Sequence, residues 1–282
     1  MIISASRRTD IPGFYSDWFY RRIEEGMVYT RNPRNPKQVK IITLSPDTVD
    51  GFVFWSKNPL PMLPRLIELA SYPYYFQYSL TPYEEDVQPK VPPVFNIGIE
   101  TFKRFSALLG PDRIIWRYDP VLLSKKYDHS FHIKNFSRMA SLLEGYTNHC
   151  TFSFLDDYRT IIKNTAKLGL QVIQKEDMYL LGKEFSFIAK TYSMALDTCA
   201  ETIDLQEFGI SHARCIDDRI LAKIKGKNLN LKKDPNQRSV CGCVQSVDIG
   251  TYNTCMHGCL YCYANTKPHI ATKVSNPNSF FL

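Results

Sequence analysis

The sequence has no long hydrophobic run. Its apolar stretches, such as residues 51–55, are far shorter than the roughly 20 residues that a helix needs to cross a bilayer. Within residues 1–8 the basic pair follows the apolar stretch, which is the reverse of the order in a secretory signal. These absences predict a cytoplasmic protein with no membrane partner.

Three widespread enzyme motifs are also absent. The sequence contains no G-x-x-x-x-G-K-[ST] loop, no G-x-G-x-x-G fingerprint and no H-E-x-x-H or H-x-x-E-H pattern. Because these motifs bind nucleotide phosphates, dinucleotides and catalytic zinc, their absence argues against an ordinary nucleotide triphosphatase, a nicotinamide dehydrogenase and a zinc hydrolase. Two of the histidines, His129 and His132, are predicted to form a pair on a helix surface.

The composition is that of a globular protein. The chain has 282 residues, 44% of them hydrophobic and 22% charged, which is enough to bury a full core. Thirty-five Lys and Arg residues against 28 Asp and Glu residues give a net charge of +7. This moderate excess favours anionic ligands and makes nucleic acid a hypothesis that charge alone does not establish.

Short apolar segments alternate with longer segments of helical periodicity over the first two hundred residues. Strands separated by helices run parallel, so the pattern predicts an α/β fold, a parallel (β/α) barrel of the TIM type with six strands in a partial barrel. The predicted strands are 2–6, 51–55, 74–80, 113–118, 151–155 and 194–199. The predicted helices are 16–25, 62–71, 97–109, 131–144, 158–168 and 177–190, followed by shorter ones at 201–208 and 217–225.

Two segments depart from this alternation. Residues 27–44 contain two strand-like runs around Asn-Pro-Arg-Asn-Pro, which predicts an inserted β-hairpin. Residues 205–282 have few regular elements and too little apolar sequence for a core of their own. We therefore predict a barrel over residues 1–204 and a cysteine-rich segment, 205–282, packed at the mouth of the barrel within the same domain.

Polar residues follow several predicted strands. For any single one of them, capping of the next helix is the commoner role. Their repetition nevertheless indicates a binding site, because loops after parallel strands converge at one end of the sheet. Arg7, Lys57 and Arg117 are predicted to place three cations around this mouth, where they would bind the anionic groups of a nucleotide or substrate.

Three of the eight cysteines, Cys255, Cys259 and Cys262, form a C-x3-C-x2-C motif. Three thiolates at this spacing can bind three irons of a four-iron–four-sulfur cluster and leave the fourth iron open. The segment resembles the motif of the radical S-adenosylmethionine superfamily, including an aromatic residue, Tyr261, before the third cysteine. That superfamily also uses a parallel α/β barrel.

The resemblance implies a reaction and its partners. S-adenosylmethionine binds the open iron, one electron from the reduced cluster breaks its carbon–sulfur bond, and the 5′-deoxyadenosyl radical abstracts hydrogen from a substrate. Tyr261 would pack near the adenine, and a flavodoxin or ferredoxin would supply the electron. In the superfamily the motif usually follows the first strand, whereas here it lies near the C-terminus. Circular permutation or a different connection to the same mouth would account for this position.

Two other functional classes remain open. Zinc bound by the three cysteines and His257 would give a zinc-stapled module, for example for nucleic acid, although zinc sites more often use separate two-residue knuckles. An iron–sulfur protein that transfers electrons or senses redox state would keep the cluster without cleaving S-adenosylmethionine.

Four of the remaining cysteines require an explanation of their own. Cys241 and Cys243 form a C-x-C pair, while Cys199 and Cys215 lie further upstream. Four thiolates can ligate a second iron–sulfur cluster or a zinc ion. Cys150 is predicted to be a buried core residue.

The whole chain also resembles an uncharacterised bacterial family, a domain of unknown function with a C-terminal motif of the radical type. The residues that carry this resemblance are Ser-Arg-Arg-Thr-Asp-Ile-Pro at 6–12, Phe-Trp-Ser-Lys-Asn-Pro at 54–59, Arg-Tyr-Asp-Pro at 117–120 and the cysteine block at 241–264. Arg-Tyr-Asp-Pro is loosely similar to a sequence in spore photoproduct lyase, a radical enzyme that repairs DNA. No substrate follows from either resemblance.

Overall fold

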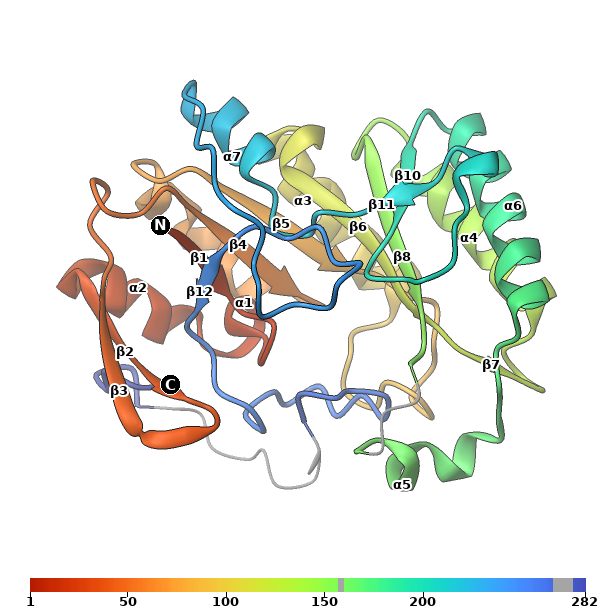
Figure 1. The fold of residues 1–282 in the computed structure, drawn as a ribbon, viewed down its shortest axis with the longest axis horizontal. Helices are drawn as coiled ribbons and strands as arrows, with labels where there is room; N and C mark the ends of the chain where they lie inside the picture. The colour runs from red at the N-terminus through yellow and green to blue at the C-terminus, as the bar shows by residue number, and fades with distance from the viewer. Residues whose placement is uncertain (157–159, 266–275) are drawn as a thin grey trace.

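A parallel β-sheet of eight strands forms the centre of the molecule (Figure 1). The computed structural model describes residues 1–156, 160–265 and 276–282. The strand order in the sheet is β11-β10-β8-β6-β5-β4-β1-β12, and every pair of neighbours is parallel. An α/β fold with a parallel sheet is therefore confirmed.

The six predicted strands are all present and lie side by side in chain order, so each crossover connects neighbouring strands. They are β1 (Ile2–Ala5), β4 (Gly51–Ser56), β5 (Tyr74–Ser79), β6 (Ile114–Val121), β8 (His149–Phe154) and β10 (Ala195–Thr198). The predicted number of strands is wrong, because two very short strands from the C-terminal segment extend the sheet. These are β11 (Ser211–His212) beside β10 and β12 (Ser246–Asp248) beside β1.

The sheet is open. Its edge strands are β11 and β12, and among the described residues neither pairs with the other, so no closed barrel is formed. Because β11 and β12 lie in residues 205–282, that segment contributes to the sheet itself as well as packing against it.

Amphipathic helices cover one face of the sheet (Figure 1). Large aromatic side chains on this face, among them Trp18, Phe54, Trp116 and Phe152, are buried in one core. The main helices are α2 (Ser16–Glu25), α3 (Ile99–Leu109), α4 (His129–Leu143) and α6 (Lys175–Thr191), with the short α1 (Ile11–Phe14) preceding α2. Among the described residues, none of the helices combines the length and the apolar character that a membrane span requires.

Three predicted helices differ from the structure. The one at 62–71 is a 3-10 helix, Leu60–Leu69, because Pro61 and Pro64 lack the amide donors of an α-helix. The one at 158–168 is reduced to α5 (Ile162–Thr165) and a 3-10 turn, Ala166–Leu168, while residues 157–159 lie outside the described residues. The one at 201–208 is a loop that ends in the 3-10 turn Gln206–Phe208, whereas the last predicted helix is present as α7 (Asp218–Lys225).

The predicted hairpin is confirmed. It consists of β2 (Met27–Asn32) and β3 (Asn35–Thr43), which pair antiparallel outside the main sheet. The C-terminal tail lies against it, since the amide of Tyr29 donates to the carbonyl of Phe280 at 3.0 Å. A second small antiparallel pair joins β7 (Leu123–Ser124) and β9 (Leu170–Gln171).

The chain between β11 and β12 covers the other face of the sheet (Figure 1). It builds a second apolar cluster in which Ile216 and Leu221 pack with Val53, Tyr75 and Ile115 of the strands. The Tyr75 hydroxyl donates to the Cys215 carbonyl at 2.8 Å and fixes this chain to the sheet. This second face of the sheet, which we call the inner face, is therefore covered by the chain and does not line an empty barrel.

One of the two histidines predicted on a helix surface is buried instead. His132 has no exposed surface, and its imidazole lies 2.9 Å from the Tyr118 hydroxyl and 2.8 Å from the Leu122 carbonyl. Burial disfavours the imidazolium and lowers the pKa of His132 to about 4.

We therefore expect His132 to weaken the fold in acid. Between pH 6.5 and 4 the unfolded chain takes up a proton at this position while the folded protein does not, so stability falls as pH falls. The shift corresponds to about 3 kcal/mol over this range. Urea unfolding of His132→Gln should show a shallower loss of stability in this pH range than wild type. His212→Gln, which removes an exposed imidazole, should match wild type, and equal slopes for all three proteins would contradict the prediction.

Candidate functional site

The motif segment, residues 250–265, leaves the sheet directly after β12 and lies along its lower end in Figure 1. Asp248, the last residue of β12, accepts hydrogen bonds from the Ser4 and Ser6 hydroxyls and from the Arg7 amide. Gly250 follows at a point of close approach, where an added Cβ would lie 2.0 Å from Ser6 Oγ. The motif segment is therefore anchored to the loop that follows β1.

A tight turn brings the three motif cysteines together. Gly258 has a φ of +72°, a conformation that glycine adopts without strain, and the amide of Cys262 donates to the carbonyl of Cys259 at 3.2 Å. The amide of Leu260 donates to the carbonyl of Val87 at 3.0 Å, which attaches the turn to the loop after β5. Cys259 is buried and Cys255 and Cys262 are half-buried.

His257, inside the motif, holds the turn in place. Its Nε2 lies 2.7 Å from the Oδ2 of Asp10, and its Nδ1 lies 3.3 Å from the carbonyl oxygen of Lys90. Phe14 packs against the ring at 4.6 Å between centroids. Since both ring nitrogens face oxygen atoms of the protein, His257 has no nitrogen free to complete a zinc tetrahedron with the cysteines.

Asp10 joins three parts of the site. Its Oδ1 caps α1 by accepting a hydrogen bond from the amide of Gly13 at 2.7 Å. The same oxygen accepts a second hydrogen bond from the Ser56 hydroxyl, also at 2.7 Å. Its Oδ2 accepts from the amide of Lys57 at 2.8 Å as well as facing His257. The helix-capping role that sequence reasoning favours for such residues is thus real, but the same carboxylate also connects the ends of β1 and β4 to the motif.

Lys57 presents a buried cation to the motif cysteines. Its Nζ is buried and has no hydrogen-bond partner among the described residues. The ammonium lies 5.5 Å from the centre of the Tyr261 ring and interacts electrostatically with Cys259, Cys262 and Asp119. A buried ammonium without a partner is costly for a fold, so this position suits an anionic ligand.

The motif sulfurs interact with one another through space, and no hydrogen bond joins them among the described residues. Burial raises the pKa of Cys259 to about 12 and also raises the pKa values of Cys255 and Cys262. A bound metal would favour the thiolates instead, because its charge replaces the lost hydration. The donor set therefore suits a metal–sulfur group.

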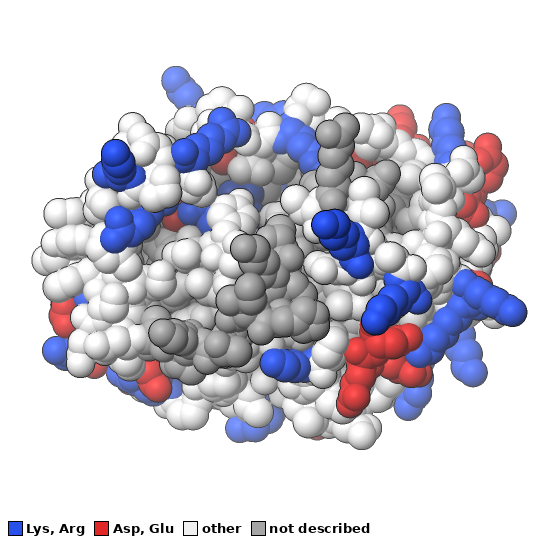
Figure 2. Space-filling model, turned by 90° about the horizontal axis from the view of Figure 1, so that it is seen from below, with Lys and Arg blue, Asp and Glu red and all other residues white. Residues whose placement is uncertain are grey.

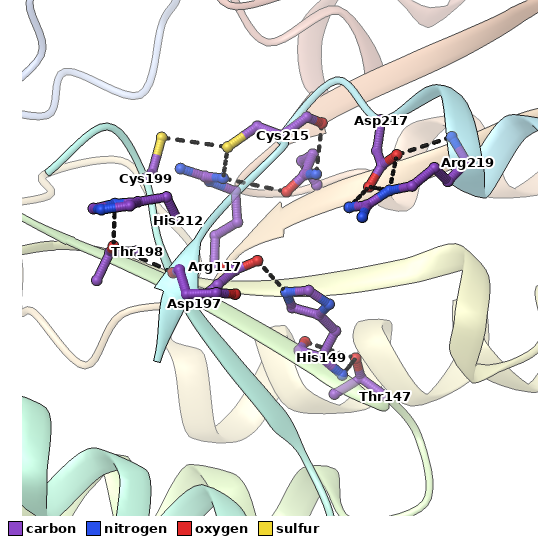
Figure 3. Close-up of polar contacts among 12 residues, drawn as sticks. Arg117, Thr147, His149, Asp197, Thr198, Cys199, His212, Cys215, Asp217 and Arg219 are labelled. Carbon is purple, nitrogen blue, oxygen red and sulfur yellow. Dashed lines mark hydrogen bonds and ion pairs between the residues drawn. The ribbon is translucent and has the colours of Figure 1, made fainter. Parts of the chain in front are cut away.

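The other four cysteines meet on the inner face of the sheet. Cys215 Sγ lies 3.3 Å from Cys199 Sγ, and further side-chain hydrogen bonds link Cys215 to Cys243 and Cys243 to Cys241 (Figure 3 shows the first contact). Within the described residues, no three His, Cys, Asp or Glu side chains already surround one point as metal ligands do. The four thiols thus form a chain of contacts. Cys150 lies apart from them, buried as predicted.

The three predicted cations differ in their nearest partners. Arg117 is 2% exposed and bonds to Cys215 Sγ at 3.0 Å and to the carboxylate of Asp119 (Figure 3 shows the former). Arg7 interacts electrostatically with Cys243 and Cys215 but also with Asp248 and Tyr263, so it borders both the four-cysteine group and the motif segment. Lys57 interacts with the motif cysteines Cys259 and Cys262, and Asp119 is within electrostatic range of both Lys57 and Arg117.

Tyr261 lies within the protein rather than at an open surface. It is 7% exposed, and its hydroxyl accepts a hydrogen bond from Gln88 at 2.7 Å. Its ring packs with Tyr83 and Val87 in a third apolar cluster. The contact with adenine implied by the resemblance stays a prediction.

Two carboxyl groups, Asp119 and Glu201, were not among the predicted site residues. Asp119 is held by Arg117 and by the Ser153 hydroxyl, and its pKa is lowered, because these partners outweigh burial. Burial raises the pKa of Glu201 to about 7. The polar residues at the ends of the predicted strands 113–118 and 194–199 were the signal for both, but the partners of these side chains are known only from the tertiary structure.

The charged side chains of the described residues are distributed over the face seen in Figure 2. In this part of the surface, Lys and Arg side chains are dispersed, and Asp and Glu side chains gather near one edge. Among the described residues, the lysines and arginines of this face form no continuous basic track of the kind that nucleic acids bind.

A comparison with protein families identifies the family to which the chain belongs. Residues 2–264 match the family model DUF1848, described as a domain of unknown function. The chain belongs to this family. No curated protein matches it. The DUF1848 domain includes all strands of the sheet and ends shortly after Cys262, so both cysteine groups are part of it. This confirms the resemblance to an uncharacterised family and leaves the reaction to be argued from the site.

Proposed function

We propose that this protein is a radical S-adenosylmethionine enzyme, and that Cys255, Cys259 and Cys262 bind a four-iron–four-sulfur cluster with one open iron. The observation that carries the proposal is the position of these thiols. The turn that carries them follows an edge strand of a parallel sheet and contacts the loops after β1, β4 and β5 through His257, Tyr261 and Leu260. Ligands of parallel α/β folds bind at this end of the sheet.

The number of ligands at the motif supports a cluster with an open iron rather than a structural zinc ion. A structural zinc ion takes four ligands, whereas a four-iron cluster with one open iron takes three. His257 is engaged by Asp10, so three thiols are available and a fourth protein ligand from the motif is not.

The strand order supports circular permutation as the reason for the C-terminal motif. Counted from its edge, the sheet begins with β12 and continues through β1, β4 and β5. The motif therefore follows the first strand in space, although this strand is the last in the chain. The superfamily's usual arrangement, with the motif after the first strand, is obtained if β12 takes that place.

The residues of the chain then have separable roles. A bound four-iron cluster would supply the one-electron reduction that cleaves S-adenosylmethionine. The three cysteines would hold the iron, His257 and Asp10 fix the turn that carries them, and Lys57 would offer a cation to the carboxylate of the nucleotide or to an anionic substrate. The buried surroundings of Cys259 and Tyr261 exclude water from the site.

The decisive experiment is anaerobic reconstitution with iron and sulfide. We expect about four irons per chain at this site, an electron paramagnetic resonance spectrum of the reduced cluster that changes on addition of S-adenosylmethionine, and reductant-dependent formation of 5′-deoxyadenosine. A cluster whose spectrum ignores S-adenosylmethionine would instead indicate electron transfer or redox sensing. Zinc at these three cysteines, with nucleic-acid binding that collapses in salt, would indicate the zinc-stapled module.

A further inference from the structure

The chain between β10 and β12 has little regular structure to hold it on the sheet. Apart from β11 and the eight residues of α7, its described residues form turns, one 3-10 turn and a single bridge between Lys233 and Val244. Four buried or half-buried thiols lie along this chain. We infer that Cys199, Cys215, Cys241 and Cys243 bind one structural zinc ion that fastens this chain to the inner face of the sheet.

Contact between the sulfurs selects one ion over a second cluster. Tetrahedral zinc with bonds of about 2.3 Å places its ligand sulfurs about 3.8 Å apart, close to van der Waals contact. Cys199 and Cys215 are 3.3 Å apart, and Cys215, Cys243 and Cys241 are close enough to affect one another's pKa values. The outer members, Cys241 and Cys199, are within electrostatic range of each other. A four-iron cluster would have to separate Cys199 from Cys215, whereas a single zinc ion keeps these two sulfurs near their present distance.

The surroundings suit thiolates. The guanidinium of Arg117 donates to Cys215 Sγ at 3.0 Å, and the amide of Ile216 donates to Cys243 Sγ at 3.3 Å. Donors of this kind orient metal ligands and stabilise their charge. One zinc ion with four thiolates keeps two negative charges, and two arginines, Arg117 and Arg7, interact electrostatically with Cys215.

The backbone allows the four cysteines to converge. Gly242 separates the two cysteines of the C-x-C pair, and a Cβ at this position would lie 2.8 Å from the carbonyl oxygen of Ala213. Only glycine allows the two stretches of chain to approach so closely. The four ligands come from the end of β10 and from the chains on both sides of α7, so one ion joins three segments.

The test separates this site from the motif site. A variant with alanine at Cys255, Cys259 and Cys262 should contain about one zinc ion per chain when purified without added iron. Adding serine at Cys215 and Cys243 should reduce zinc to below about a tenth of that value, since two of four ligands are lost. Cys150→Ala in the same background should keep the zinc, because Cys150 lies in the core on the other face.

The full chain provides a measurement that does not depend on variant folding. Exchange of the bound metal for Co²⁺ should give the visible absorption of tetrahedral cobalt thiolate. Sulfide-containing iron in the motif-deficient variant, a Cys199–Cys215 disulfide detected by mass, or the absence of any metal would each overturn the zinc assignment. Zinc at the four cysteines of the wild-type chain, with no 5′-deoxyadenosine formed after reconstitution of the motif cluster, would overturn only the proposed function.

Discussion

Alanine at Cys259 is expected to remove the iron of the motif cluster and to abolish 5′-deoxyadenosine formation. The substitution leaves two protein ligands, Cys255 and Cys262, for a cluster that already has one open iron. Loss of a hydrogen-bond partner of a metal ligand typically costs roughly 10- to 100-fold in affinity, and loss of the ligand itself should cost more. Iron and sulfide content, together with chromatography of the nucleotide product, measure the effect.

Cys150→Ala is the matched control for this substitution. Cys150 is fully buried on β8, in the core on the helix-covered face, away from both cysteine groups. We expect it to keep the iron, the nucleotide cleavage and the zinc, with a small loss of stability. Full iron content in Cys259→Ala, or equal loss in both variants, would mean that the motif does not hold the cluster.

Alanine at Asp10 is expected to destabilise the fold and to release the motif turn. It leaves the amides of Gly13 and Lys57, the Ser56 hydroxyl and the His257 ring without their acceptor. Each buried group left unpaired costs about 1–3 kcal/mol, and loss of a buried charge partner costs a total of about 3–5 kcal/mol. Denaturant unfolding should show this loss, and reconstitution should give less iron per folded chain.

Asp128→Ala tests whether the effect of Asp10 exceeds that of an ordinary helix cap. Asp128 caps α4 by accepting from the amide of Phe131 at 2.8 Å, on the outer surface. Its loss should cost about 1 kcal/mol and leave iron content unchanged. The conservative Asp10→Asn variant should keep the cap of α1 but weaken the connection to His257, so its iron content should fall more than its stability. Normal iron content in both Asp10 variants would remove Asp10 from the site.

The strands were the part of the fold that sequence patterns predicted best. Their apolar runs are buried on both faces of a parallel sheet, so hydrophobicity alone marks them. The edge strands β11 and β12 escaped prediction because two or three residues carry no periodic signal. In the segment 60–69 helical periodicity was present, but two prolines removed the amide donors that an α-helix needs.

Local spacing and tertiary contact contributed differently to the two cysteine groups. The motif turn is local, since eight consecutive residues contain all three thiols, and its chemistry follows from the sequence alone. The four-cysteine group joins residues 199 to 243, and its existence depends on how the intervening chain folds. From the sequence, this group could bind either a zinc ion or an iron–sulfur cluster, whereas the contact between the Cys199 and Cys215 sulfurs favours a single ion.

By itself the sequence determined the parallel α/β class, the six central strands and the thiols of the motif, because these depend on hydrophobic patterns and short spacings. Only the tertiary structure decided that β12 lies beside β1, that His257 bonds to Asp10, that Arg117 bonds to Cys215 and that Lys57 lies by the motif. These facts depend on strand register and on contacts between residues up to 247 positions apart, which local patterns do not encode.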